Sequence, residues 1–190
     1  MLFHNIPGNS RILFVALKRY FSFLFVYRSY NTIIYNVMIR QATKNDFEQW
    51  LRMRKLLYPE SSQNELMSEI KKIFYDKTIV GELDYIVFVY EKNKLMLGGF
   101  IETSLRQKVS NCKSSPVGYI ESLYVDSDIR RNGIARDLVR ESEKWIKENG
   151  CSEFAVDTDP DEKGSIEFYL SCGFAQVRRS ESEVLLIKQV

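Results

Sequence analysis

The segment Arg130-Arg131-Asn132-Gly133-Ile134-Ala135 decides how the rest of this chain is interpreted. It lies between a strand-like run, Val117 to Val125, and a long amphipathic helical pattern that ends near Asn149. A glycine-centred turn that opens into a helix leaves backbone N–H groups without partners, and the helix dipole adds positive potential there. Glycine also lets a phosphate approach the backbone closely. The segment therefore predicts a pyrophosphate cradle, with Arg130 and Arg131 adding positive charge.

Two common phosphate-binding motifs do not fit this turn. The chain has no G-x-G-x-x-G, which excludes the Rossmann fingerprint, and no Lys-Ser/Thr pair follows Gly133, which excludes a P-loop. A glycine at a strand-to-helix turn also has a plain conformational explanation. The turn alone therefore does not indicate a function, and motifs elsewhere in the chain are needed to interpret it.

A second motif, Tyr169-Leu170-Ser171-Cys172-Gly173-Phe174, ends another short helical pattern downstream. With the turn, it resembles the GNAT superfamily of N-acetyltransferases, in which an R/Q-x-x-G-x-G/A loop holds the pyrophosphate of acetyl-CoA. The resemblance implies that Tyr169 is the acid that protonates the departing thiolate. It also implies that acetyl-CoA contacts one set of main-chain and loop residues: Leu123, Tyr124, Val125, Arg130, Arg131, Asn132, Gly133, Ile134 and Ala135.

Four further segments are similar to aminoglycoside 6′-N-acetyltransferases. They are Trp50 to Pro59, Phe100 to Arg106, Ser114 to Glu121, and Cys151 to Thr158. This narrower resemblance implies that Glu121 and Asp157 bind the amines of an antibiotic and that Tyr58 forms an aromatic floor for a sugar ring. It also implies a role in antibiotic resistance.

The residues themselves leave alternatives open. Glu121 and Asp157 lie in otherwise apolar strands, where an ionised group needs a reason to be present, but each could be a solvent-facing position. Either could relay a proton. Tyr169 could be a packed tyrosine with its hydroxyl satisfied locally, and Tyr58 an ordinary aromatic at the edge of the core.

Three weaker candidates, Glu102, Ser104 and Arg106, share one face of a strand by their spacing, and a structural ion pair explains them equally well. Lys108 and Arg178 are cations close to these motifs. Positive charge near a site for cationic amines is unfavourable, so both side chains should point away or pair with acids such as Glu181.

The charge distribution argues against nucleic acid as a partner. Residues 1–37 hold four of the 27 basic residues and no acid, so residues 38–190 carry 23 basic against 25 acidic residues. A nucleic-acid-binding domain would show a basic face. The mildly acidic body is compatible with a small polycationic substrate.

Cysteine and histidine usage restricts the chemistry further. Three cysteines without a C-x-x-C motif indicate neither a disulfide framework nor a zinc site, and favour a reducing cytoplasm. The single histidine, His4, precedes the domain, which excludes Ser-His-Asp and Cys-His nucleophiles and histidine metal sites. Direct attack by an amine on a thioester fits this inventory, with no metal.

Residues 1–37 are aromatic, basic and free of acids. Lys18-Arg19 interrupts the most apolar part, so we expect no stable membrane span, and no convincing signal-peptide cleavage site follows. We expect an extension outside the fold at 1–37 and an acetyltransferase domain at 38–190.

Hydrophobic periodicity predicts a single α/β domain of the α+β type, with a mixed, mostly antiparallel sheet of about six or seven strands and about four helices. The expected strands are Val37–Ala42, Leu83–Tyr90, Leu95–Arg106, Val117–Val125, Ser152–Asp157, Phe174–Val177 and Val184–Ile187. The expected helices follow Thr43 as far as Leu57 and cover Glu60–Tyr75, Arg130–Asn149 and Gly164–Ser171.

The leading hypothesis is an acetyl-CoA-dependent N-acetyltransferase acting on a small amine, with the 6′-amine of an aminoglycoside as the favoured acceptor. Acetylation of a polyamine or of a protein N-terminus is the alternative within enzymes. A CoA-binding regulatory module without turnover is the non-enzymatic alternative. The resemblance further implies that a homodimer could form through the C-terminal strands.

Overall fold

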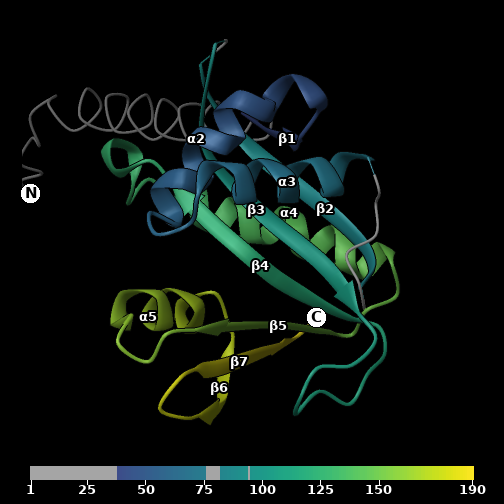
Figure 1. Ribbon diagram of the computed structural model, residues 1–190. Coiled ribbons are helices and arrows are strands. Elements are labelled where there is room, and N and C mark those ends of the chain that lie inside the picture. The colour runs from purple at the N-terminus through teal and green to yellow at the C-terminus, as the bar shows by residue number, and fades with distance from the viewer. Residues whose placement is uncertain (1–37, 76–81, 94) are drawn as a thin grey trace, which may run out of the picture. The chain divides into compact units, whose positions relative to one another are not determined.

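Seven strands form one mixed sheet in the order β1-β2-β3-β4-β5-β7-β6 (Figure 1). The computed structural model describes residues 38–75, 82–93 and 95–190. Every neighbouring pair of strands is antiparallel except β4 and β5, which are parallel. The strands are β1 (Ile39–Gln41), β2 (Glu82–Asn93), β3 (Met96–Arg106), β4 (Val117–Val125), β5 (Glu153–Thr158), β6 (Ala175–Arg179) and β7 (Val184–Gln189). The predicted fold class is confirmed.

Four α-helices in the described residues flank this sheet. They are α2 (Phe47–Leu57), α3 (Gln63–Tyr75), α4 (Ile134–Glu148) and α5 (Lys163–Ser171), and two short 3-10 helices, η1 (Lys44–Asp46) and η2 (Ser127–Ile129), precede α2 and α4. Figure 1 shows α2 and α3 on one face of β2–β4 and α4 on the opposite face. Trp50, Met53 and Phe100 are fully buried between α2 and the sheet.

Helix starts follow capping residues that the sequence contains. The expected box between Thr43 and Asp46 is present, although it opens η1. Helix α3 starts at Gln63, not at the expected Glu60, because Ser62 and Glu65 form a second box: the Glu65 amide donates to Ser62 Oγ at 3.3 Å, and the Ser62 amide donates to Glu65 Oε2 at 2.9 Å.

The buried stripe of α4 differs from the expected one at a single position. Ile134, Leu138 and Ile146 are buried as expected, but Trp145 is only half-buried. Ser142 is buried instead, and its Oγ accepts a hydrogen bond of 2.9 Å from Thr103 Oγ1 on β3. A buried hydroxyl with a hydrogen-bond partner is compatible with the core.

Two further expectations, a homodimer and a domain boundary, concern the C-terminal strands and residues 1–37. All of β6, an edge strand, is exposed, and the expected homodimer stays a prediction. Residues 1–37 lie outside the described residues, so the domain boundary also stays a prediction. Among the described helices, none has the length and hydropathy needed to cross a bilayer.

Candidate active site

Strands β4 and β5 pair at one end only. Gly118 pairs with Phe154 and Tyr119 with Ala155, and no later pair joins these strands in the described chain. Figure 1 shows the strands diverging from there, with α5 near their separated ends. We call residues 120–125 of β4 and 156–158 of β5 the fork. Because β4 has no strand partner along this edge, its backbone groups can bind another molecule.

Glu121 lies in a β-bulge at the base of the fork. The pairing of β3 with β4 shifts by one residue between Glu102 and Thr103, which leaves Glu121 without a partner on β3. A bulge changes the direction of nearby side chains and is common beside active sites. The bulge therefore sets where the Glu121 carboxylate is presented.

The loop between β4 and α4 has the conformation of an anion cradle. Arg131 and Gly133 have positive φ angles of 66° and 82°. Such angles are not helical, so α4 starts at Ile134, and the expected start at Arg130 was wrong. Gly133 is the N-cap and offers no side chain to the first-turn amides of Ile134 and Ala135. A Cβ placed on Gly133 would meet no atom within 4 Å. These amides and the helix dipole fit a phosphate group.

Two side chains of the cradle brace the loop. Arg130 Nε donates to the carbonyl oxygen of Val125 at 2.8 Å, and Asn132 Nδ2 donates to that of Ile129 at 3.2 Å. The side chain of Arg131 is exposed. Both arginines keep their positive charge. Arg130 is fixed by its hydrogen bond, whereas Arg131 makes no hydrogen bond within the described residues.

An ion pair that the sequence analysis missed fixes the start of this loop. Arg52 on α2 donates from both terminal nitrogens to the Asp126 carboxylate, at 3.1 and 3.2 Å, and also to the Leu97 carbonyl at 2.9 Å. The Asp126 amide bonds the Gly98 carbonyl at 2.8 Å. The partners are 74 residues apart, so no local pattern could have revealed them.

Tyr169 lies on α5 and is 7% exposed. Its ring packs against Phe168 and Phe174, with centroids 5.1 and 5.6 Å away. Burial raises the pKa of Tyr169 well above its ordinary value, and Cys172, Tyr58 and Asp157 act in the same direction. Within the described part of the chain, its hydroxyl has no hydrogen-bond partner. A protonated hydroxyl is thus left available beside the fork.

The two candidate carboxylates differ in their surroundings. Asp157, at the end of β5, is exposed and accepts a hydrogen bond from the Tyr119 hydroxyl. Glu121 is half-buried, forms an ion pair with Arg106 at 2.6 Å, and accepts a hydrogen bond from Ser104. Asp157 and Tyr58 both raise the pKa of Tyr169, so these two expected residues lie within electrostatic range of the third.

Tyr58 follows the last residue of α2 and contacts the fork. Its hydroxyl shares a hydrogen bond of 2.6 Å with Ser122 Oγ. The guanidinium of Arg54 lies 5.5 Å from the centre of its ring. Burial raises the pKa of Tyr58, although the bond to Ser122 opposes this. Tyr58 is therefore held at both its ring and its hydroxyl.

Glu102 has a structural role. It is 1% exposed and forms an ion pair with Arg54 at 2.7 Å. It also accepts hydrogen bonds from Trp50 Nε1 at 2.8 Å and from the Tyr85 hydroxyl at 2.9 Å. Of the two explanations left open, the structural ion pair is the observed one, and its partner is Arg54. Arg106, on the same face, pairs with Glu121 instead.

The two cations that disfavoured a polycationic acceptor behave differently. Arg178 pairs with a neighbouring acid as expected, although the acid is Glu183 and not Glu181. Lys108 is exposed in the loop between β3 and β4. The charge of Arg178 is therefore compensated.

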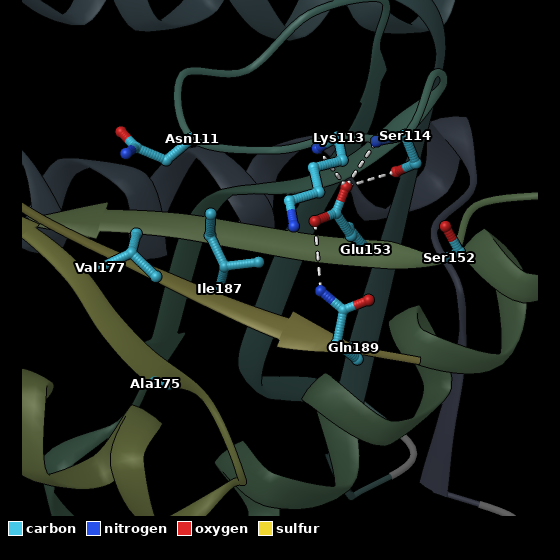
Figure 2. Close-up of a pocket in the computed structure, with 9 residues that line it drawn as sticks. All are labelled: Asn111, Lys113, Ser114, Ser152, Glu153, Ala175, Val177, Ile187 and Gln189. Carbon is cyan, nitrogen blue, oxygen red and sulfur yellow. Dashed lines mark hydrogen bonds between the residues drawn. The ribbon is translucent and has the colours of Figure 1, made fainter.

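A pocket of about 550 Å³ lies at the other end of β5 from Asp157 (Figure 2). Its carboxylate, Glu153, accepts hydrogen bonds from the amides of Lys113 and Ser114 and from Gln189 Nε2, as Figure 2 shows. One Glu153 oxygen thus holds the β3–β4 loop and the other bonds Gln189 on β7, so the candidate active site is the fork and not this pocket. No cluster of acidic, cysteine or histidine side chains that could hold a metal ion occurs in the described residues.

The model of the Acetyltransferase (GNAT) family matches residues 47–174, more than half of the sequence. The chain belongs to this family, and it is accordingly an acyltransferase that depends on acetyl-CoA. The described residues fit that co-substrate, because the cradle offers unpaired amides and the fork offers an unpaired strand edge.

Three relatives show what the chain is similar to. Aminoglycoside N(6′)-acetyltransferase type 1 of Klebsiella aerogenes is 32% identical over 140 residues, which cover 74% of this chain and 90% of that protein. A solved structure of AAC(6′)-Iy in complex with the bisubstrate analog CoA-S-monomethyl-acetylneamine is 28% identical, with a TM-score of 0.67, and covers 75% of this chain and 92% of that one. A ribosomal-protein-alanine N-acetyltransferase from Brucella melitensis has a TM-score of 0.62 at 17% identity, over 80% and 99% of the two chains, which shows the fold alone.

Proposed function

We propose that this protein transfers acetyl from acetyl-CoA to the 6′-amine of aminoglycosides and so confers resistance to them. The proposal is carried by one observation: Tyr58 and Asp157 lie within electrostatic range of Tyr169, and α5, which carries Tyr169, contacts the first turn of α4 through a 3.2 Å hydrogen bond from Arg136 to Ser171. The similarity to aminoglycoside acetyltransferases supports the choice of acceptor.

The cradle and the fork would hold the co-substrate. Backbone amides from Arg131 to Ala135 would bind the pyrophosphate, and the unpaired edge of β4 from Leu123 to Val125 would bind the pantetheine arm. When bound, acetyl-CoA supplies an acetyl group activated as a thioester. The residues of this chain must then position an amine, remove its proton and protonate the thiolate.

Asp157 is the better placed of the two carboxylates to bind an ammonium group. It is exposed and forms no ion pair within the described residues, whereas both oxygens of Glu121 already contact Arg106. Glu121 remains a proposed substrate residue that would share its charge with Arg106. Asp157 would accept the amine proton directly or through water as the amide bond forms.

Tyr169 is the proposed acid. Its raised pKa keeps the hydroxyl protonated at neutral pH, and that hydroxyl has no competing acceptor in the described chain. It would transfer its proton to the thiolate as the carbon–sulfur bond breaks. Tyr58 would support a sugar ring, because its own ring is held by Arg54 and Ser122.

The decisive experiment measures thiol release from acetyl-CoA with four acceptors in parallel: kanamycin, tobramycin, spermidine and a short peptide. Turnover with the aminoglycosides alone would support the proposal. Turnover only with spermidine or only with the peptide would overturn the acceptor assignment. Calorimetric CoA binding without any turnover would favour the regulatory module.

A matched pair of antibiotics tests the position of transfer. Neomycin carries an amine at the 6′ position, where paromomycin carries a hydroxyl, and the two are otherwise the same. We expect turnover with neomycin and a loss of at least about a hundredfold with paromomycin. Equal turnover with both would place the acetyl group elsewhere and contradict 6′ transfer.

A further inference from the structure

Two side chains, Arg106 and Tyr119, connect the two carboxylates of the fork in an unbroken series. Glu121 forms a bidentate pair with Arg106, through Nε at 3.0 Å and Nη2 at 2.6 Å. The Arg106 guanidinium lies 3.5 Å from the centre of the Tyr119 ring. The Tyr119 hydroxyl donates to Oδ1 of Asp157. The series therefore runs from Glu121 through Arg106 and Tyr119 to Asp157.

Tyr119 stands where β4 and β5 separate. It is the last residue of β4 that pairs with β5, opposite Ala155, and Asp157 lies two residues beyond Ala155 on the same face. The tyrosine is 6% exposed, so its ring is rigidly packed. Its hydroxyl bonds the carboxylate of Asp157, which lies on β5 beyond the last residue that pairs with β4.

The Tyr119 hydroxyl is protonated at neutral pH and donates to Asp157. Burial raises the pKa of Tyr119 well above its ordinary value, and the bond to Asp157 raises it further. A neutral hydroxyl that donates to a carboxylate makes a charge-assisted hydrogen bond, which is stronger than one between neutral groups. Asp157 is thus tied by one oxygen, while its second oxygen has no partner in the described residues.

Arg106 compensates the charge of one of the two carboxylates, Glu121, and not that of Asp157. Its cation compensates Glu121 in a bidentate pair, and its flat face packs on the Tyr119 ring. The fork therefore presents one uncompensated carboxylate, Asp157, in place of two. An exposed aspartate near the end of a strand would otherwise sample several rotamers.

We propose that Tyr119 is a positioning residue for acetyl transfer, which holds Asp157 so that its free oxygen faces the ammonium group of the acceptor. The inference rests on the proposed function, because it assumes that Asp157 binds the amine. Tyr119 does not touch the acceptor, and it acts through Asp157 alone. Removing its hydroxyl should matter only while Asp157 is present.

A double-mutant cycle tests this dependence. Tyr119→Phe keeps the ring and should lower kcat/KM for the acceptor by about tenfold, with unchanged CoA affinity by calorimetry. Asp157→Asn should lower it further. In the Asp157→Asn background, Tyr119→Phe should have less than about a twofold effect. An equal loss in both backgrounds would overturn the proposal.

Tyr85→Phe is the matched control, because it removes a hydroxyl bonded to a different carboxylate, the buried Glu102. Any effect it has should be the same with and without Asp157→Asn. The cycle is measured with whichever amine the wild-type protein acetylates. Activity confined to a non-aminoglycoside amine would therefore reject the proposed acceptor and still test Tyr119.

A crystal structure of Tyr119→Phe provides a result that needs no acceptor. We expect the Asp157 carboxylate to occupy several orientations in that variant and a single one in the wild-type protein. The same single orientation in both proteins would overturn the positioning role, whatever the activity assays show.

Discussion

Gly133 and Gly150 bracket helix α4 with nearly the same left-handed backbone, at φ angles of 82° and 80°. Neither has an atom within 4 Å of where a Cβ would stand. Gly133 is the N-cap within the cradle, and Gly150 follows the C-cap residue Asn149. The two positions share their conformational cost and differ only in their surroundings.

Substitution of each glycine by alanine separates stability from cofactor binding. Each change should cost about 1 kcal/mol, because alanine disfavours positive φ, and should lower Tm to a similar extent. Only Gly133→Ala should weaken CoA binding, by tenfold or so, because its methyl group would occupy open space that a phosphate needs to approach the cradle backbone. Calorimetry with CoA measures this, and equal affinities in the two variants would contradict the cradle.

Tyr169→Phe should lower kcat by about a hundredfold or more and leave CoA affinity unchanged, because the thiolate loses its proton donor. The raised pKa of Tyr169 also predicts a pH dependence. The acid form is lost only when the pH exceeds that raised pKa. Tyr169 should therefore cause no decline in the wild-type kcat below about pH 10.

The control for this variant is Tyr85→Phe, which removes the hydroxyl of a tyrosine on β2 and should keep kcat within about twofold. If Tyr169→Phe retained full turnover, water or another group would have to supply the proton.

Glu102→Ala should strongly destabilise the fold. It would leave the buried guanidinium of Arg54 without its principal partner, which costs about 3–5 kcal/mol. Replacing both residues, Glu102→Leu with Arg54→Met, should recover much of this loss because no buried charge remains. Urea denaturation at pH 7 gives both values, and a double variant as unstable as Glu102→Ala would contradict the explanation.

Glu153 should make the free energy of unfolding depend on pH in the acidic range. Burial alone would raise its pKa, but hydrogen bonds from Ser114, Gln189 and Lys113 lower it from 4.5 to about 2. A lowered pKa in the folded state adds stability above the ordinary value, and this stability is lost as the pH falls towards 2.

The advantage of wild-type over Glu153→Gln in unfolding free energy should therefore be smaller at pH 3 than at pH 6 by about 2 kcal/mol. Chemical denaturation at both pH values measures it. A constant advantage would show that the carboxylate is not stabilised in its ionised form.

Local patterns predicted the elements well and their ends less well. The bounds of β4 were predicted as observed, and Gly150 does end α4. The start of α4 was displaced by four residues because periodicity does not detect the positive φ of Arg131 and Gly133. Periodicity also placed Trp145 in the buried stripe, where the structure buries Ser142 and leaves Trp145 half-buried.

The candidate site was predictable where motifs carry it. Tyr169 was expected from a resemblance to a family motif, the cradle from a glycine turn before a helix, and Glu121 and Asp157 from charges in apolar strands, and the roles of all of them stay predictions. Tyr119 was missed because a tyrosine in a strand looks like an ordinary core residue. Its role depends on a partner 38 residues away, across two strands that pair only briefly.

The amino-acid sequence by itself determined the strand, the glycine turn and the helix that form the cradle, because backbone geometry within one turn depends on residues that are neighbours in the chain. Tertiary structure alone decided which carboxylate keeps a free oxygen. That outcome depends on strand register and on a single bulge, which bring Arg106 to Glu121 and Tyr119 to Asp157. The local sequence permits several strand registers, and only the packing of the sheet fixes the one in which these contacts form.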